Sequence, residues 1–151
     1  VESMKISIQK EDFDIAIETQ QLREANPETG ALVTFSGLVR DMDNEKQVES
    51  LTLEHYPGIT DSSLETIITE AQERWSILDA SVIHRIGELK AGEQIVFVAV
   101  VSLHRADAFS ACEFIMDFLK TRAPFWKKCR DEHGESWVES KASDDDASAR
   151  W

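Results

Sequence analysis

The sequence predicts an α+β fold with a largely antiparallel sheet and two main helices. Segments with strand-like patterns follow one another in pairs, and two long segments show clear helical periodicity. A doubly wound fold would instead alternate strands and helices regularly along the chain. The 151 residues are 42% hydrophobic and 30% charged, which is ordinary for a globular protein, so we expect residues 1–151 to form a single domain.

The two main helices are predicted from apolar residues spaced three or four positions apart. Thr60–Trp75 has the clearest pattern, and Thr60 or Asp61 is suited to cap its first turn. The second helix is predicted at Ala106–Lys120, with an apolar stripe of Phe109, Cys112, Met116 and Leu119. Ile15–Glu24 is weakly helical, and Ser143–Trp151 fits either a short helix or a docked tail.

The strands are predicted from alternation or from apolar content. Gln94–Leu103 is nearly continuously apolar and rich in β-branched residues, which is typical of a buried strand. The remaining strands are expected at Met4–Ile8, Ala31–Val39, Val48–Tyr56 and Ala80–Ile86, and in a hairpin formed by Phe125–Arg130 and Ser136–Ser140.

The connections between these strands contain glycines and polar runs. Gly37 interrupts its strand and predicts a bulge or a close backbone approach. The polar run Asp41–Gln47 is expected to be a loop, and Gly87–Glu93 is expected to turn the chain.

A basic segment follows the second long helix. The chain has a formal net charge of −13, yet no acid lies between Lys120 and Arg130. Pro124 ends the helix and forces a bend, so Lys120 and Lys127 are expected on either side of it, facing one pocket. The same residues also fit a cationic helix end followed by a solvated edge strand.

Other candidate residues are less specific. His104 and Arg105 stand where a strand gives way to a helix N-terminus, which suits a phosphate, although a capping His and a surface Arg fit equally. His55 and His84 lie within strands and are interpreted as structural. Cys129, between two basic residues, fits an activated thiol or an ordinary exposed one.

Several functional classes are disfavoured by composition. The acidic net charge argues against a nucleic-acid-binding surface, and no apolar run is long enough to span a membrane. The sequence lacks metal-ligand spacing, a glycine-rich phosphate loop and a signal-peptide pattern. We therefore expect a cytoplasmic protein without a metal or cofactor.

Four stretches resemble the large, catalytic subunit of molybdopterin synthase. They are TFSGLVRD (Thr34–Asp41), LTLEHYPGIT (Leu51–Thr60), VIHRIGELKAGEQIVFV (Val82–Val98) and FIMDFLKTRAPFWKK (Phe114–Lys128). WVES at 137–140 and the closing Arg150-Trp151 also fit, so the resemblance covers nearly the whole chain in the same order.

The resemblance implies an α/β hammerhead-type fold and a sulfurtransferase of molybdenum cofactor biosynthesis. It implies a homodimer that binds a small ubiquitin-like sulfur-carrier subunit at each end, forming a heterotetramer. The carrier's C-terminal Gly-Gly thiocarboxylate would supply two sulfurs to cyclic pyranopterin monophosphate, which yields molybdopterin. The alternative is a non-catalytic dimeric module that binds a phosphorylated ligand or a protein tail.

The resemblance also implies a set of site residues. Lys120 and Lys127 are the expected catalytic residues, and a neighbouring protomer is expected to supply His104 and Arg105. Further substrate contacts are implied for Leu38, Val39, Arg40, Lys128, Cys129 and Lys141. The chain departs from the family pattern at two positions: Lys141 stands where Arg is frequent, and Cys129 where an acid is common.

Overall fold

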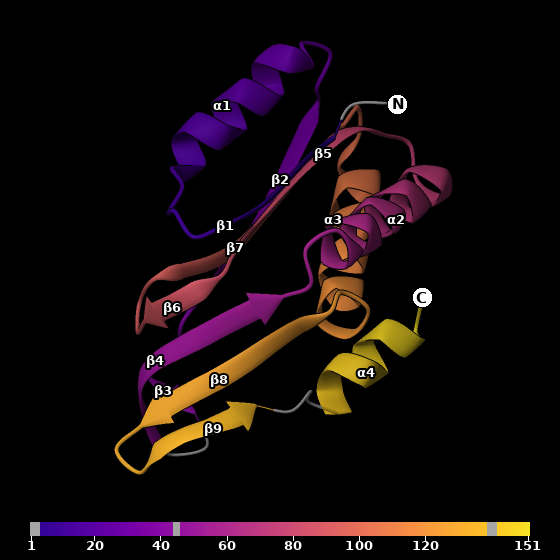
Figure 1. The fold of residues 1–151 in the computed structure, drawn as a ribbon. Helices are drawn as coiled ribbons and strands as arrows, with labels where there is room; N and C mark the ends of the chain where they lie inside the picture. The colour runs from indigo at the N-terminus through magenta and orange to yellow at the C-terminus, as the bar shows by residue number, and fades with distance from the viewer. Residues whose placement is uncertain (1–3, 44–45, 139–141) are drawn as a thin grey trace.

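The computed structural model describes residues 4–43, 46–138 and 142–151, and within these ranges it forms two sheets and four helices (Figure 1). The strands are β1 (Lys5–Gln9), β2 (Ala31–Leu38), β3 (Met42–Asp43), β4 (Lys46–His55), β5 (Ile77–Arg85), β6 (Gly87–Lys90), β7 (Gln94–Ser102), β8 (Phe125–Asp131) and β9 (Gly134–Val138). The helices are α1 (Ile15–Ala25), α2 (Ile59–Arg74), α3 (Arg105–Thr121) and α4 (Ala142–Ala149).

The first sheet has the strand order β1-β5-β7-β2 and is antiparallel except for the β1–β5 pair. The second sheet has the order β3-β4-β8-β9, with β6 also paired to β4. Neighbouring strands pair in antiparallel fashion throughout the second sheet. The predicted α+β class with largely antiparallel pairing and two main helices is thus confirmed.

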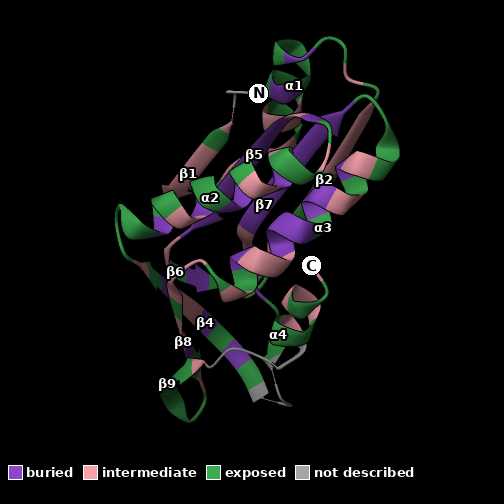
Figure 2. Cartoon of the chain, turned by 90° about the vertical axis from the view of Figure 1, so that its right-hand side faces the viewer, coloured by how far each residue is buried: buried purple, intermediate pink, exposed green. Residues whose placement is uncertain are grey.

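Helices cover both faces of the first sheet. Figure 2 shows α2 and α3 side by side over one face, while α1 lies on the other face. Buried residues of α2 and α3 pack against the strands in one hydrophobic cluster. Residues of β5 and β7 are therefore buried whichever way they point. This explains why β7 is nearly continuously apolar instead of alternating.

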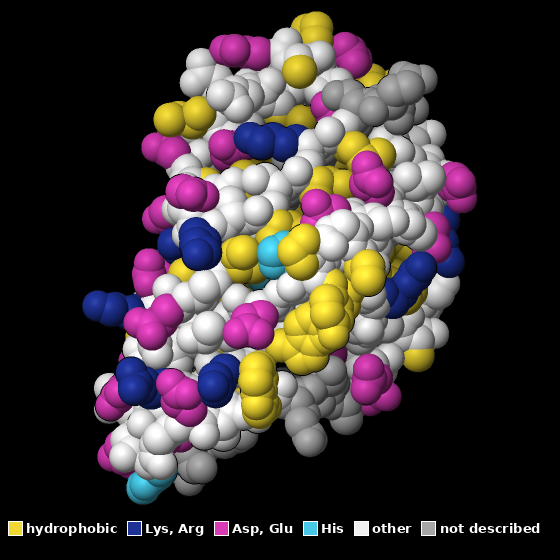
Figure 3. All heavy atoms as spheres, in the orientation of Figure 1, with side chains coloured by type: hydrophobic (Ala, Val, Ile, Leu, Met, Phe, Trp, Pro, Cys, Tyr) yellow, Lys and Arg dark blue, Asp and Glu magenta, His cyan; other side chains and the backbone are white. Residues whose placement is uncertain are grey.

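The second sheet keeps large hydrophobic side chains at its surface. Tyr56 and Trp126 are exposed, and their rings meet edge to face with centroids 4.3 Å apart. A hydrophobic patch is visible near the end of β4 and the start of β8 in Figure 3. Trp137 on β9 is also exposed, with the Lys128 ammonium 5.3 Å from its ring centroid.

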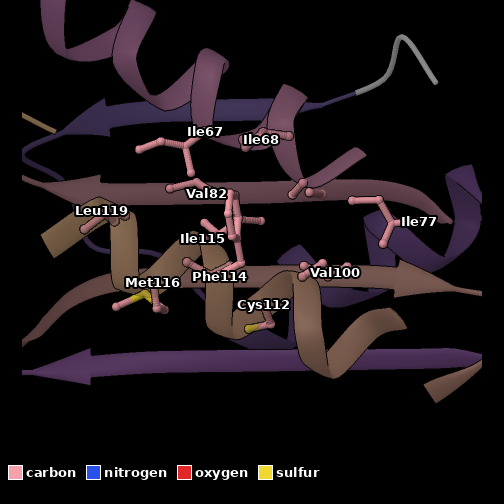
Figure 4. Packing of buried hydrophobic residues seen from close by; sticks show 14 of the residues in the cluster. Ile67, Ile68, Ile77, Val82, Val100, Cys112, Phe114, Ile115, Met116 and Leu119 are labelled. Carbon is pink, nitrogen blue, oxygen red and sulfur yellow. The ribbon is translucent and has the colours of Figure 1, made fainter. Parts of the chain in front are cut away.

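The main core lies between the first sheet and the helix pair. Figure 4 shows Phe114 and Ile115 of α3 beside Val82 of β5, with Ile67 and Ile68 of α2 directed toward the same strand. All five of these side chains are fully buried. Burial of such a side chain contributes about 1.5–3 kcal/mol, so this layer fixes α3 firmly on the sheet.

The predicted stripe of α3 was wrong at one position. Cys112, Met116 and Leu119 are buried as expected, but Phe109 is 60% exposed. The buried face instead follows Ala108, because helical positions 108, 112, 115 and 119 align while 109 is rotated toward solvent.

Three local predictions also need correction. Helix α2 is capped by Gly58, with φ of 84°, and not by the side chain of Thr60 or Asp61. The expected loop at 41–47 contains β3 and the start of β4, which pair with each other. The expected turn at 87–93 contains β6, whose Leu89 is fully buried against the second sheet. For β6 the partner β4 is distant in sequence, so the local pattern does not reveal the pairing.

Thr60 has a tertiary role instead of a capping role. Its buried hydroxyl accepts a hydrogen bond from the Tyr56 N–H and donates one to the Pro124 carbonyl, both at 3.0 Å. It thereby joins the start of α2 to the bend that precedes β8, across 64 positions of sequence.

We expect Thr60→Val to lower the free energy of unfolding by about 1–3 kcal/mol, because the isosteric side chain leaves two partly buried backbone groups without their partner. Urea denaturation followed by circular dichroism measures this difference. Thr66→Val is the matched control, since the exposed Thr66 hydroxyl bonds only within its own helix, to the Ser62 carbonyl. Equal destabilisation by the two substitutions would contradict the proposed clamp.

Candidate functional site

A cavity of about 270 Å³ lies where the two sheets and the C-terminal end of α3 meet. Its basic lining residues are Arg40, Lys120 and Lys127, which come from three separate parts of the chain. Most of the remaining wall is apolar and includes Phe35, Leu38, Ile95, Val96 and Phe125. An apolar pocket with a few converging charged groups is the usual form of a small-molecule site.

The end of β2 places Arg40 at this cavity. The β2–β7 register shifts between Gly37 and Leu38, and a Cβ at Gly37 would lie 2.7 Å from Cγ1 of Val96. The predicted irregularity at Gly37 is therefore confirmed as both a bulge and a close approach. Val39 is then held by backbone hydrogen bonds to Glu93 and Gly92, at 2.9 and 2.8 Å.

The bend after α3 places the two lysines. Lys120 occupies the last turn of α3, and its neighbour Leu119 is buried in the main core. Pro124 follows, and β8 begins at Phe125. Lys120 and Lys127 both line the cavity, as expected from the helix end, the proline and the strand that follows.

Alternation along β8 separates its side chains onto two faces. Phe125, Lys127 and Cys129 line the cavity. Lys128 belongs to the opposite face, where its Nζ lies 3.1 Å from a Glu135 carboxylate oxygen. The resemblance groups Lys128 with the substrate contacts, but the structure places it outside the cavity lining.

Cys129 is buried, whereas the sequence suggested an activated or an ordinary exposed thiol. It is 8% exposed and packs among Val39, Val48, Leu53 and Leu89. The expectation of an ordinary exposed thiol is wrong, because the inward strand position outweighs the charge of the flanking residues. The other thiol, Cys112, lies in the main core, where burial raises its pKa to about 12.

His84 is the lining residue that sequence reasoning undervalued. It is 4% exposed, and its ring stacks on Phe125 with centroids 3.8 Å apart and an interplanar angle of 15°. Burial lowers its pKa to about 3, and the positive charges of Lys127 and Lys120 act in the same direction. The available signal was a histidine near the end of a buried strand, at a position facing the helices.

Asp144 is a second lining residue that had not been singled out. It belongs to α4, so the C-terminal segment is both a helix and a docked tail. The Ser148 hydroxyl donates to the Asp117 carbonyl at 2.9 Å, and Trp151 Nε1 donates to the Asp117 carboxylate at 2.5 Å. These contacts hold α4 against α3 and thereby keep Asp144 at the cavity.

His104 and Arg105 do not join this cavity within one chain. They stand at the N-terminal end of α3, and Lys120 is near its C-terminal end, about 22 Å away at 1.5 Å per residue. Both side chains are exposed, and His104 makes no side-chain capping bond. Lys141 lies outside the described residues.

The described lining favours a negatively charged ligand. Arg40, Lys120 and Lys127 outnumber Asp144, and cations in a partly apolar cavity make strong charge-assisted bonds to phosphate or carboxylate. No three His, Cys, Asp or Glu side chains are arranged to hold a metal ion within the described part of the chain. None of the helices in the described ranges is long and apolar enough to cross a bilayer.

We expect Cys129 to react faster with an anionic methanethiosulfonate reagent than with a cationic one, by about tenfold at low salt, because the lining cations attract the anion. Cys112→Ser protein isolates the Cys129 reaction, which mass spectrometry follows over time. Cys129→Ser protein is the control: its Cys112 should react slowly with both reagents, since that thiol is buried with a raised pKa. Equal rates for the two reagents at Cys129 would contradict a positive cavity.

Comparison with known proteins agrees with this geometry. The profile of the MoaE protein family matches residues 8–122. The Vibrio cholerae molybdopterin synthase catalytic subunit is 52% identical over 147 residues, which cover 97% of each chain. A solved structure of the Burkholderia ambifaria MoaE protein superposes with a TM-score of 0.85 at 50% identity, covering 98% of this chain and 97% of that one.

A more distant solved structure shares the same architecture. The crystal structure of molybdopterin synthase from Staphylococcus aureus matches with a TM-score of 0.79 at 34% identity, covering 88% of this chain and 96% of that one. The family profile covers more than half of the chain, and the relatives extend over nearly all of it. From its sequence and its fold, this chain belongs to the MoaE protein family.

Proposed function

We propose that this protein is the catalytic subunit of a molybdopterin synthase. The observation that carries the proposal is the convergence of Arg40, Lys120 and Lys127 on one cavity in a member of this family. The substrate would be cyclic pyranopterin monophosphate, whose phosphate suits Arg40 and whose ring suits the apolar wall. The reaction adds two sulfurs to that substrate.

Sulfur would arrive on a separate protein. Relatives are named catalytic subunits, which implies a second subunit, and we propose a small carrier with a C-terminal Gly-Gly thiocarboxylate. In each transfer the sulfur bonds to a side-chain carbon of the pterin, and a carbon–oxygen bond at that carbon breaks. The bond from the carrier's carbonyl carbon to sulfur also breaks, and water supplies the oxygen that leaves the carrier with an ordinary carboxylate. Charge develops in the tetrahedral species on this route, and Lys120 and Lys127 can stabilise it and move protons.

Cys129 is not needed as a sulfur source in this scheme, because the carrier brings the sulfur. Its place in the cavity wall is consistent with a packing role. Leu38, the last residue of β2, and Val39, which follows it, lead the backbone to Arg40. These two residues shape the cavity wall and fix the backbone position of Arg40.

The overall activity is tested by mixing the purified protein with thiocarboxylated carrier and cyclic pyranopterin monophosphate. The dithiolene product, detected by mass spectrometry, supports the enzyme. Binding of carrier or pterin without product over many hours would instead support the non-catalytic dimeric module.

We expect Lys120→Ala to lower the single-turnover rate by on the order of a hundredfold or more, because an oriented charge at the reacting carbonyl is lost. The fold should be unaffected, since Lys120 is exposed at a helix end. Lys120→Arg separates the roles: it keeps the charge but cannot act as base or nucleophile. Lys90→Ala, at an exposed lysine on β6, is the control. Near-normal turnover by Lys120→Ala would show that the catalytic centre lies elsewhere.

We also propose that the active unit is a homodimer in which His104 and Arg105 of one protomer complete the cavity of the other. The exposure of both residues, at the far end of α3 from Lys120, supports a role outside their own cavity.

We expect inactive Lys120→Ala and Arg105→Ala proteins to regain activity when mixed and allowed to exchange subunits. Each mixed dimer has one intact site, so a random mixture should recover about a quarter of wild-type activity, as expected for a two-fold symmetric assembly. Mixing Lys120→Ala with Lys127→Ala is the control, because both substitutions fall in the same cavity wall and no intact site forms. Absence of recovery in mixtures shown by native mass spectrometry to contain mixed dimers would refute sharing between protomers.

A further inference from the structure

His84 has the surroundings of a group held in one orientation and one protonation state. Its Nδ1 lies 2.8 Å from the Arg85 carbonyl oxygen, and Phe125 stacks on its ring. A carbonyl oxygen can only accept a hydrogen bond, so Nδ1 carries the proton and donates it. The other ring nitrogen, Nε2, therefore bears the lone pair whenever the ring is neutral.

The ring stays neutral over the whole range in which proteins normally work. Burial lowers its pKa to about 3, and Lys127 of β8, Lys120 of α3 and His55 of β4 reinforce this effect. Opposing these, the backbone hydrogen bond to Arg85 raises the pKa. His84 is thus a lasting hydrogen-bond acceptor and a very poor proton acceptor.

The carbonyl that fixes this tautomer is itself immobilised. The Arg85 guanidinium donates to the Lys10 carbonyl at 2.9 and 3.1 Å and to the Gln94 carbonyl at 3.0 Å. These bonds tie the end of β5 to the loop after β1 and to the start of β7. The His84 ring is consequently oriented by a rigid part of the first sheet.

The acceptor stands beside the reactive lysines. His84 lines the same cavity as Lys120 and Lys127. Phe125, which stacks on the His84 ring, precedes Lys127 by two residues on the same face of β8, so their backbones are about 7 Å apart. A lysine side chain of ordinary length can span that separation.

We propose that His84 is a positioning residue for Lys127, holding the lysine Nζ through a hydrogen bond accepted by the His84 Nε2. This inference rests on the proposed function. A neutral acceptor can orient an ammonium or amine group without taking its proton, and it adds no positive charge to a cavity that already contains several cations. The direction of the Nζ atom toward the carrier's carbonyl then depends on His84.

The test compares two substitutions in the reconstituted assay. His84→Phe keeps the ring volume and the stacking on Phe125 but has no acceptor, and His84→Gln retains an acceptor oxygen near the Nε2 position. We expect His84→Phe to lower the single-turnover rate by about ten- to hundredfold, as for a misplaced catalytic group, with carrier affinity unchanged. His84→Gln should recover most of the rate.

The failures are distinguishable. If the wild-type protein forms no product, the proposed function fails. If wild type is active and His84→Phe turns over at the wild-type rate, or if the Phe and Gln variants are both folded and equally slow, the positioning role fails.

A measurement on the wild-type protein covers the case in which the variants do not fold. In ¹⁵N-histidine-labelled protein, the His84 signals, assigned through contacts with Phe125, should show a protonated Nδ1 and an unprotonated Nε2 from pH 5 to 9. The Nε2 signal should shift in Lys127→Ala and stay in place in Lys90→Ala. Titration of the ring near pH 6.5, a proton on Nε2, or no response to Lys127→Ala would overturn the proposal.

Discussion

The bend between α3 and β8 is the constraint on which the site depends. The buried Thr60 hydroxyl donates a hydrogen bond to the Pro124 carbonyl. The start of α2 therefore holds the short connection between α3 and β8 in place. On one side of that connection α3 is packed into the core of the first sheet; on the other side β8 enters the second sheet. Lys120 and Lys127 line the same cavity because both flanking elements are fixed, and a looser bend would separate them.

Sequence pattern was sufficient where a residue's role is set by its neighbours in the chain. The helix end, Pro124 and the alternation after it placed Lys120 and Lys127 in one cavity, and Gly37 indicated the bulge before Arg40. Sequence pattern was insufficient where residues distant in the chain determine the structure. Leu89 reads as part of a turn, yet it is buried because β6 pairs with β4. Asp144 reads as one acid in an acidic tail, and only the docking of α4 on α3 brings it to the cavity.

The electrostatics of the site differ from those of the whole chain. A net charge of −13 repels anionic ligands at long range, while Arg40, Lys120 and Lys127 attract them inside a partly apolar cavity. Salt screens the long-range repulsion more strongly than the short, partly buried contacts. Specific binding therefore depends on contacts inside the cavity. This favours a ligand that is carried into the cavity on a protein tail, or recognised there by close contacts, over a ligand attracted by the charge of the whole surface.

Keeping His84 neutral among these cations has a thermodynamic cost that is set by pH. Its folded pKa of about 3 is far below the ordinary value of 6.5, so in acid the unfolded chain takes up a proton that the folded chain cannot. Its contribution to stability is therefore complete above pH 6.5 and is lost progressively as pH falls toward 3. A phenylalanine would fill the same space beside Phe125 without this penalty. A buried acceptor that costs stability in acid, and that lines the cavity, is better explained by a role at the cavity than by packing alone.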